Sequence, residues 1–256
     1  MSYLFFYKII TMTKETEKKR WTPNKRRFVC FLDIMGFKDY IARNKHQDIY
    51  KMMSTISDSK QFYNETAEAL FDKNILFVTT FSDSVIIFSK DNSQDSLNAI
   101  TYVSASILAD GAKNKIPMKG AMAEGLLTVD KAKSIFFGQP LIDAYLLQEN
   151  EVFYYGVVCH NSMETFIEDF KSKSLWVQTL YEEIKTPLKS GVIRHFNLNW
   201  FNFLSYGPDD PKRMKSMTEN FNKIIKDFKS KVSGKPRKYI DNTEAVFQSF
   251  YPSATK

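Results

Sequence analysis

Residues 27–37 read RFVCFLDIMGF, a run of aromatic and β-branched side chains that reaches a carboxylate, Asp33, and then a glycine, Gly36. Such a run is typical of a buried strand. Residues 34–37 are expected to begin a helix, whose first N–H groups can cradle a phosphate because Gly36 allows close approach. The stretch therefore predicts a strand that carries Asp33 to the edge of a sheet, beside a helix N-terminus.

The segments that follow predict the order of the remaining elements. Helices are expected over residues 47–71 and 94–112, where apolar side chains recur at helical spacing, and strands over 74–81, 84–89 and 117–124. The second and third strands meet at Ser82 and Asp83, which predicts a hairpin with Asp83 at its tip. The order strand, helix, strand, strand, helix, strand predicts an α+β, ferredoxin-like βαββαβ fold.

The chain is expected to have three parts: a flexible basic N-terminal segment (1–26), one domain (27–170) and a C-terminal extension (171–256). Residues 1–12 are expected to be either a loosely docked terminus, with Met1 as the start, or a segment before a true start at Met12. The later elements expected are a short helix over 141–148, a strand over 151–158, one or two strands within 191–205, and an amphipathic helix with an apolar stripe from Met214 to Val232. That stripe is expected to pack on the domain or on a second subunit.

Charge is distributed unevenly along the chain. The sequence has 256 residues with 36 Lys and Arg against 29 Asp and Glu, a formal net charge of +7. Residues 14–27 carry +5 and residues 211–239 carry +8, which leaves −6 for everything else. Nucleic-acid-binding domains typically carry a continuous basic surface, whereas this chain has an acidic body with basic flanks, so no nucleic-acid partner is expected.

The two cysteines, Cys30 and Cys159, are isolated in sequence, so neither a disulfide framework nor a zinc site is expected. Having only two isolated cysteines favours a reducing, cytoplasmic location for the protein. The apolar start, residues 1–12, is too short to span a bilayer, and no membrane span is expected.

Two carboxylates, Asp33 and Asp83, are expected at the same edge of the sheet. An oxygen-rich pair without a cysteine or histidine cluster suits Mg²⁺ or Mn²⁺, and it can hold two ions for phosphoryl or nucleotidyl transfer. The alternative for each aspartate taken alone is a turn former or a helix cap.

At these residues the sequence resembles the class III nucleotidyl cyclases. The matching stretches are FLDIMGF (31–37), TFSDSV (80–85), KGAMAEG (119–125) and FGQPLIDAY (137–145). The resemblance spans about residues 28–160. It implies a cyclase domain with extra C-terminal strands and helices, in which Asp33, the Ile34 carbonyl and Asp83 bind two metal ions. Gly36 and Phe37 would contact the substrate.

The sequence departs from the family at the residues that recognise a purine base. Phe77 and Ile135 occupy the two positions, and neither can form the usual hydrogen bonds. Ile142 and Leu146 stand where the catalytic Asn and the transition-state Arg would fall. This combination resembles the pyrimidine cyclases of the bacterial Pycsar antiphage system. It implies UTP or CTP as substrate, cUMP or cCMP as product, Mn²⁺ (or Mg²⁺), a homodimer with sites at its interface, and a separate effector that the product activates.

Further substrate contacts are predicted at three positions. Strand alternation puts Thr79 and Phe77 on one face, where Thr79 can bond a pyrimidine edge and Phe77 can fill the space of a purine, unless Phe77 belongs to the core. Lys119 matches a basic position of the family, and the alternative is an ordinary surface lysine. Arg43 and Arg194 are further candidates for the missing cation.

Two other functions remain open at this point. One is a purine cyclase or another two-metal nucleotidyltransferase on the same scaffold. The other is a degenerate, non-catalytic module that senses nucleotides, which the absence of the expected Asn and Arg would explain.

Overall fold

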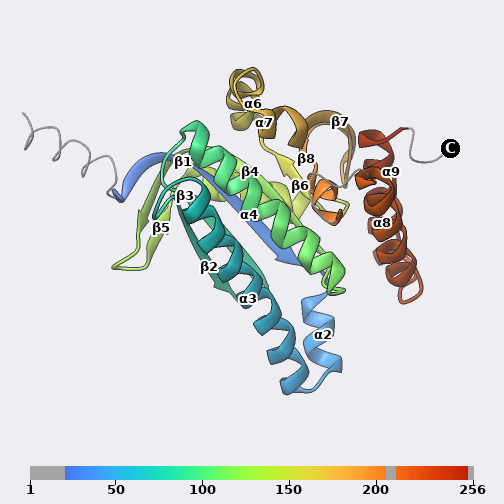
Figure 1. Cartoon of the computed structure of the whole chain (residues 1–256). Helices are drawn as coiled ribbons and strands as arrows, with labels where there is room; N and C mark the ends of the chain where they lie inside the picture. Colours follow the sequence, from blue (N-terminus) through green and yellow to red (C-terminus); the bar gives the residue numbers. More distant parts are fainter. Residues whose placement is uncertain (1–20, 206–211, 253–256) are drawn as a thin grey trace, which may run out of the picture.

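A computed structural model describes residues 21–205 and 212–252 of the chain, and its centre is one eight-stranded sheet (Figure 1). The strands are β1 (Asn24–Ile34), β2 (Leu76–Phe81), β3 (Ser84–Ser89), β4 (Met118–Asp130), β5 (Ile135–Phe137), β6 (Val157–Cys159), β7 (Tyr181–Leu188) and β8 (Gly191–Leu198). Their order is β2-β3-β1-β4-β6-β8-β7, and β5 pairs with β4.

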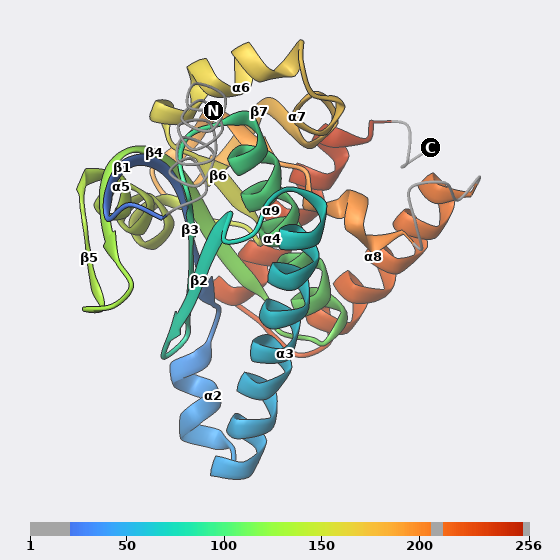
Figure 2. The ribbon, with the colours of Figure 1, turned by 60° about the vertical axis from the view of Figure 1, so that its left-hand side comes forward.

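The helices gather mainly on one face and at one end of this sheet. They are α2 (Phe37–Arg43), α3 (His46–Leu70), α4 (Gln94–Lys113), α5 (Gln139–Leu146), α6 (Glu164–Lys171), α7 (Leu175–Leu180), α8 (Arg213–Lys229) and α9 (Lys235–Phe250). Short turns of other types are the π-helical η1 (Leu147–Glu151) and the 3₁₀-helical η2 (Asn161–Met163) and η3 (Trp200–Leu204). In two views, α2 and the start of α3 extend from the body as a helical arm (Figures 1 and 2).

The predicted α+β fold is confirmed. The strand order β2-β3-β1-β4 and the crossing helices α3 and α4 form the ferredoxin-like βαββαβ unit, in which β1 pairs antiparallel with both β3 and β4. Alternation along β1 separates two apolar layers. Cys30 and Leu32 belong to the main core with α3 and α4, whereas Val29 and Phe31 belong to a smaller cluster on the opposite face. We call this opposite face the open face.

Close packing between β1 and β4 depends on Gly120. A Cβ atom at this position would lie 2.4 Å from the Phe31 carbonyl oxygen and 2.6 Å from a methyl carbon of Leu32. Because no real Cβ comes so near to backbone, the register that aligns β4 beside Asp33 requires a glycine here.

The C-terminal extension continues the same sheet. The β7–β8 hairpin joins it where Val158 of β6 pairs with Asn197 of β8, so the sheet crosses the boundary expected between residues 170 and 171. The amphipathic helix is α8, and its stripe packs on the domain rather than being left for a second subunit. The rings of Phe221 in α8 and Phe247 in α9 stack with centroids 3.9 Å apart.

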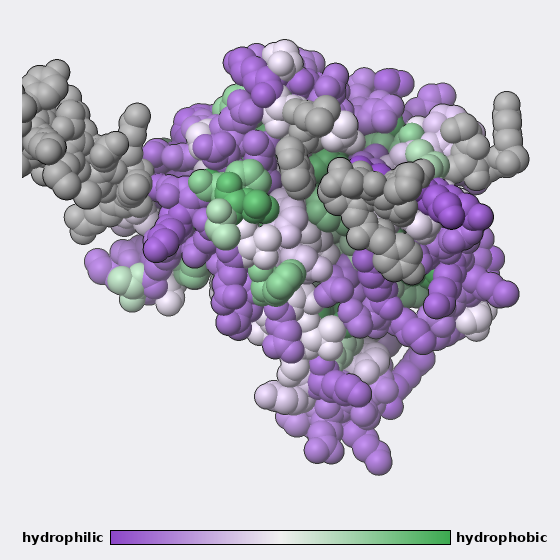
Figure 3. Space-filling model, in the orientation of Figure 1, coloured by the Kyte–Doolittle hydropathy of each residue, from purple (hydrophilic) through white to green (hydrophobic). Residues whose placement is uncertain are grey.

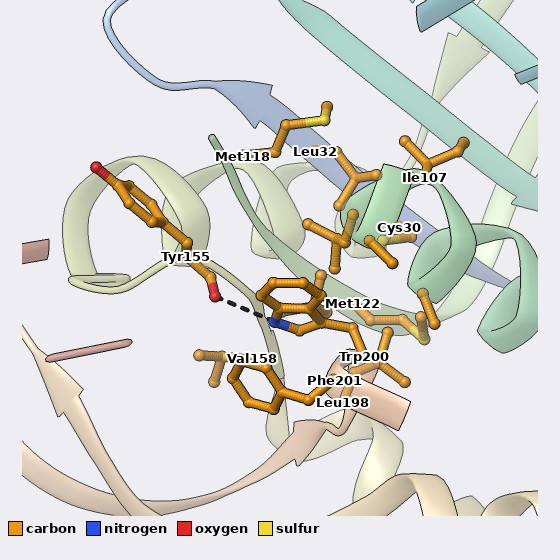
Figure 4. Close-up of a cluster of buried hydrophobic side chains, with 14 of the residues drawn as sticks. Cys30, Leu32, Ile107, Met118, Met122, Tyr155, Val158, Leu198, Trp200 and Phe201 are labelled. Atoms are coloured by element: carbon orange, nitrogen blue, oxygen red, sulfur yellow. Dashed lines mark hydrogen bonds between the residues drawn. The ribbon is translucent and has the colours of Figure 1, made fainter. Parts of the chain in front are cut away.

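Aromatic side chains from the extension complete the main core (Figure 4). Trp200 of η3 lies among side chains of β1, β4 and α4, such as Met122, and its indole N–H donates to the Tyr155 carbonyl at 3.1 Å. The extension is therefore an integral part of the folded unit.

Three expected elements differ from the structure. The strand expected over 151–158 is reduced to β6, because the Tyr155 N–H bonds the Thr243 hydroxyl at 2.9 Å and its carbonyl bonds Trp200, which leaves neither for a ladder. The helix expected over 141–148 begins two residues earlier, as α5, and continues as the π turn η1. The strand expected over 117–124 runs on to Asp130.

The predicted N-terminal segment ends too late. Residues 24–26 belong to β1, and the Trp21 indole N–H donates to the Val129 carbonyl at 2.9 Å, so this end of the segment is part of the fold. The rest of the segment, residues 1–20, lies outside the described residues.

Figure 3 shows the helix-covered face, where hydrophilic residues predominate and hydrophobic ones form separate small patches. None of the helices described is long and apolar enough to cross a bilayer.

Candidate functional site

Asp33 lies near the end of β1 on the open face of the sheet. Its register partners are Ser84 of β3 and Lys119 of β4. Directly opposite residues of paired strands project to the same side, so Asp33 and Lys119 share this face. The expectation that β1 delivers a carboxylate to a strand end is met.

Asp83 lies in the turn between β2 and β3, beside the end of β1. Its carbonyl accepts a hydrogen bond from the Ile34 N–H at 2.9 Å, and Ser82 before it takes a left-handed conformation with φ of 54°. The turn is thus tied to the residue that follows Asp33. The two aspartates predicted from sequence therefore lie at one corner of the open face.

The Asp33 carboxyl lies where its negative charge is disfavoured. Burial, and next the charge of Asp83, raise the pKa of Asp33 to about 7, while Lys119 acts in the opposite direction. A carboxyl that sheds its proton near neutrality can exchange it for a metal ion under ordinary conditions.

Lys119 is buried, with only 3% of its surface exposed, so the alternative of an ordinary surface lysine is wrong. Burial lowers the pKa of its ammonium to about 8. The ammonium donates to the Gln148 carbonyl in η1 at 2.7 Å, and its charge acts on Asp33 from there.

Several charged groups that sequence reasoning missed lie near this corner. Lys189, in the β7–β8 turn, donates to the Glu149 carbonyl of η1, next to the carbonyl that Lys119 uses. Glu149 and Lys235, at the start of α9, also act on the charge of Lys119. No local signal marks these residues, because a π turn, a strand turn and a distant helix bring them together.

The donor set fits a divalent ion that also takes oxygens from a substrate. Two carboxylates and the Ile34 backbone oxygen are hard ligands of the kind that Mg²⁺ and Mn²⁺ prefer. Within residues 21–205 and 212–252, no group of three or more His, Cys, Asp or Glu side chains could hold a metal by itself. The chain thus offers a pair of carboxylates rather than a closed metal cage.

Phe77 and Thr79 of β2 lie on the open face but farther along it. Phe77 is about 13 Å from the end of the strand, at four residues of about 3.3 Å each. Its ring packs against Phe88 and Phe136, with centroid distances of 6.1 and 5.5 Å, so it has a core role. Thr79 is half-buried opposite Ile86, nearer to Asp33.

The two substrate contacts predicted at Gly36 and Phe37 differ in exposure. Gly36 is exposed, precedes α2 with φ of 75°, and has open space around it. Phe37 is buried in the main core, so its side chain serves packing.

The positions of the expected Asn and Arg are apolar and face solvent. Ile142 and Leu146 lie one turn apart on α5 and are 50% and 46% exposed, and Ile135 is exposed as well. Of the other cation candidates, Arg194 pairs with Glu183 on the β7–β8 hairpin at 3.0 Å, and Arg43 is exposed in the last turn of α2. Neither is brought to Asp33 by a contact in the structure.

The sequence matches no protein-family model, and no match was found among curated proteins. Among solved structures, the chain is similar to a bacterial light-regulated adenylyl cyclase, with a TM-score of 0.50 and 11% identity over 84% of this chain and 67% of that one. It is also similar to the dimeric guanylyl cyclase domain of the RhoGC fusion protein from the aquatic fungus Blastocladiella emersonii. That similarity has a TM-score of 0.47 and 15% identity over 70% and 98% of the two chains.

A third similarity is to a class III adenylyl cyclase-like ATP-binding protein from Pseudomonas aeruginosa, with a TM-score of 0.41 and 14% identity over 77% and 40% of the chains. At such low identity these similarities concern architecture. The chain has the mixed α+β fold of the class III nucleotidyl cyclase domain.

Proposed function

We propose that this protein is a nucleotidyl cyclase that converts a pyrimidine nucleoside triphosphate, UTP or CTP, into its 3′,5′-cyclic monophosphate and pyrophosphate. The observation that carries the proposal is the corner where Asp33 and Asp83 meet on the open face of a class III cyclase fold, with a buried Lys119 beside them. The fold alone does not assign an activity, so the proposal depends on these residues.

In the proposed reaction, the ribose 3′-oxygen bonds to the α-phosphorus while the bond from that phosphorus to the bridging β-oxygen breaks. Pyrophosphate leaves with the electron pair, and the hydroxyl proton passes to solvent. Two divalent ions, Mn²⁺ or Mg²⁺, would when bound acidify the hydroxyl and neutralise the triphosphate. Asp33, Asp83 and the Ile34 carbonyl are the residues that would hold them.

Lys119 is proposed to bind the substrate phosphates. Its ammonium is fixed by the Gln148 carbonyl and largely removed from water, so it needs little reorganisation to face negative charge on phosphate oxygens. This would offset the absence of the family's Arg at Leu146. Gly36, with open space around it, allows the triphosphate to approach the backbone before α2.

The pyrimidine preference rests on the apolar side chains at the two base-reading positions, Phe77 and Ile135. Phe77 packs against neighbouring rings, so this position offers no hydrogen bond to a purine base. Thr79, half-buried on the same face, has a hydroxyl that can bond a pyrimidine edge.

A homodimer with the site at its interface is also proposed. Ile142 and Leu146, together with Tyr145, expose apolar surface on α5, beside the open face. Apolar side chains grouped in this way favour burial by a second chain. One neighbour in fold, the fungal guanylyl cyclase domain, is a dimer. In the cell, the product would act in the cytoplasm as a second messenger on a separate effector in antiphage defence.

The test is to incubate the purified protein with Mn²⁺ and each of ATP, GTP, UTP and CTP in separate reactions and to identify the products by mass spectrometry. Cyclic UMP or cyclic CMP is the expected product. Cyclic AMP or GMP would establish a purine cyclase, and a linear or dinucleotide product another transferase. No product from any nucleotide would favour a nucleotide-sensing module.

A further inference from the structure

A basic cavity lies on the other side of the sheet from Asp33. It has a volume of about 600 Å³ and is formed between the end of α4, η3 and α8. Figure 2 shows the C-terminal part of α8 beside the end of α4. Because α4 covers the main core and Asp33 lies on the open face, the sheet separates this cavity from the candidate catalytic corner. We call it the α4–α8 groove.

One face of α8 lines the groove. Asn220, Lys223, Ile224 and Asp227 recur at the spacing of a single helical stripe. The opposite wall is Lys113, at the end of α4. Hydrogen bonds to η3 hold a side chain from each helix. The Asn220 amide donates to the Leu204 carbonyl at 2.7 Å, and the Lys113 ammonium donates to the Phe203 carbonyl at 3.1 Å.

The ionic lining of the groove is strongly positive. Among the described residues that line it, the one carboxylate is that of Asp227, which is already paired with Lys115 at 3.8 Å and with Lys231 at 2.6 Å. In the part of the chain that the structure describes, no carboxylate lies within 4.0 Å of the ammonium groups of Lys223 and Lys226. Gathering uncompensated ammonium groups around a cavity costs free energy through mutual repulsion, and a bound anion relieves that cost.

The apolar part of the groove lining comes from Ala112, Leu204 and Ile224. Pockets of about 300 to 1,000 Å³ with an apolar lining and a few polar groups are typical of small-molecule sites. A ligand for this groove therefore needs an apolar ring to contact the apolar lining residues and several negative charges to pair with the lysines.

We propose that the α4–α8 groove binds a nucleotide-sized phosphate ester, with its ring on Leu204 and Ile224 and its phosphates on Lys113, Lys223 and Lys226. Lysine acts toward phosphate as a mobile point charge, so a cluster of three accommodates a polyphosphate without metal. This site does not depend on the proposed cyclase reaction.

The experiment measures binding of ATP, UTP and tripolyphosphate to the full-length protein by isothermal titration calorimetry in EDTA, where metal-dependent binding at Asp33 and Asp83 is suppressed. The expected result is one nucleotide per chain, bound more tightly than tripolyphosphate, which lacks the ring. Lys223→Glu with Lys226→Glu is expected to weaken nucleotide binding at least about tenfold, as the loss of close charge pairs implies.

Matched controls distinguish specific binding in the groove from non-specific attraction to a basic helix. Lys215→Glu, on an exposed part of the same helix, and Asp33→Asn are expected to leave this binding unchanged, and Lys223→Arg with Lys226→Arg to retain it. Absence of nucleotide binding in EDTA, or an equal loss of affinity with Lys215→Glu, would overturn the proposal. Circular dichroism checks that each variant is folded.

Discussion

At the scale of single residues, Asp33 is a partly buried carboxyl that lies near a second negative charge. Burial and the nearby Asp83 raise its pKa to about 7, so the folded protein holds a proton there that the unfolded chain releases near pH 3.8. A metal ion that binds there would have to displace that proton.

The first prediction is that metal affinity depends on pH through Asp33. Below pH 7, the apparent affinity for Mn²⁺ is expected to fall by about tenfold per pH unit, because one proton competes for the carboxylate. Above pH 7 the dependence should flatten. Electron paramagnetic resonance of free Mn²⁺ measures it, and an affinity that stays constant from about pH 5.5 to 7 would contradict the assignment.

The same shift has a consequence for stability without metal. Because the pKa of Asp33 is raised on folding, the folded state binds more protons than the unfolded state between about pH 4 and pH 7. The second prediction is that the contribution of Asp33 to stability is present below that window and is lost as the pH rises through it. In EDTA, Asp33→Asn should therefore reduce the fall in melting temperature from pH 5 to pH 8; an unchanged fall would refute this.

Lys119 provides the third prediction. Lys119→Met removes the fixed cation and is expected to lower kcat by about a hundredfold with a smaller change in KM, as for other groups that stabilise charge developing in a transition state. Lys119→Arg should restore part of the loss. Lys185→Met, at an exposed lysine of β7, serves as the control. Equal kcat values for Lys119→Met and the control would assign Lys119 a structural role only.

At the scale of elements, local patterns were sufficient for the first half of the chain. The β2–β3 hairpin was predicted from two β-branched runs that meet at Ser82 and Asp83, and α4 from a long apolar stripe, and both occur where expected. These patterns depend only on residues close in sequence, so they can be recognised without knowledge of the three-dimensional structure.

Later elements depend on distant partners. β7 has few adjacent apolar residues, and its strand conformation depends on pairing with β8. Helix α9 packs through Phe247 against Phe221 of α8. Tyr155 reads as part of a strand, yet its backbone groups bond Thr243 and Trp200 instead. Such long-range bonds override local propensity, and no pattern near Tyr155 reveals them.

The fourth prediction concerns the packing of α8. Phe221 is buried and stacked on Phe247, so Phe221→Ala is expected to lower the free energy of unfolding by about 3 to 5 kcal/mol. Met214→Ala, on the same helix but 48% exposed, should cost less than about 1 kcal/mol. Urea unfolding measures both. Equal effects would mean that α8 does not share the core of the domain.

At the scale of the whole molecule, the charge of +7 resolves into separate regions. The basic residues 211–239 are largely those of α8 and the start of α9, and two of their lysines line the α4–α8 groove. Asp33 and Asp83 belong to the acidic remainder. Under the proposed function, metal ions and a few fixed lysines rather than the overall field would therefore neutralise the substrate phosphates at that corner.

The candidate site was predicted from sequence only in part. Asp33 and Asp83 end local strand patterns, so the topology brings them together as expected. Lys189 and Lys235 approach Lys119 only because the extension folds back along the same sheet. Nothing in their local sequence distinguishes them from other surface lysines.

The fifth prediction is that the open face dimerises. Tyr145→Glu places a charge on the exposed apolar surface of α5 and is expected to halve the mass measured by light scattering and to remove cyclase activity. Tyr50→Glu, at an exposed aromatic of α3, should keep the mass of the wild type. A wild-type protein that is monomeric at assay concentration and still active would refute the dimeric site.

The cyclic product that carboxylate variants form tests whether Asp33 and Asp83 are the catalytic corner of a pyrimidine cyclase, as we claim. With Mn²⁺ and the preferred pyrimidine triphosphate, Asp33→Asn and Asp83→Asn are each expected to lower the rate by at least about a hundredfold. Asp95→Asn, at an exposed carboxylate of α4, should retain the wild-type rate. Cyclic UMP or CMP formed by Asp33→Asn or Asp83→Asn at the rate of the Asp95→Asn control would contradict the claim.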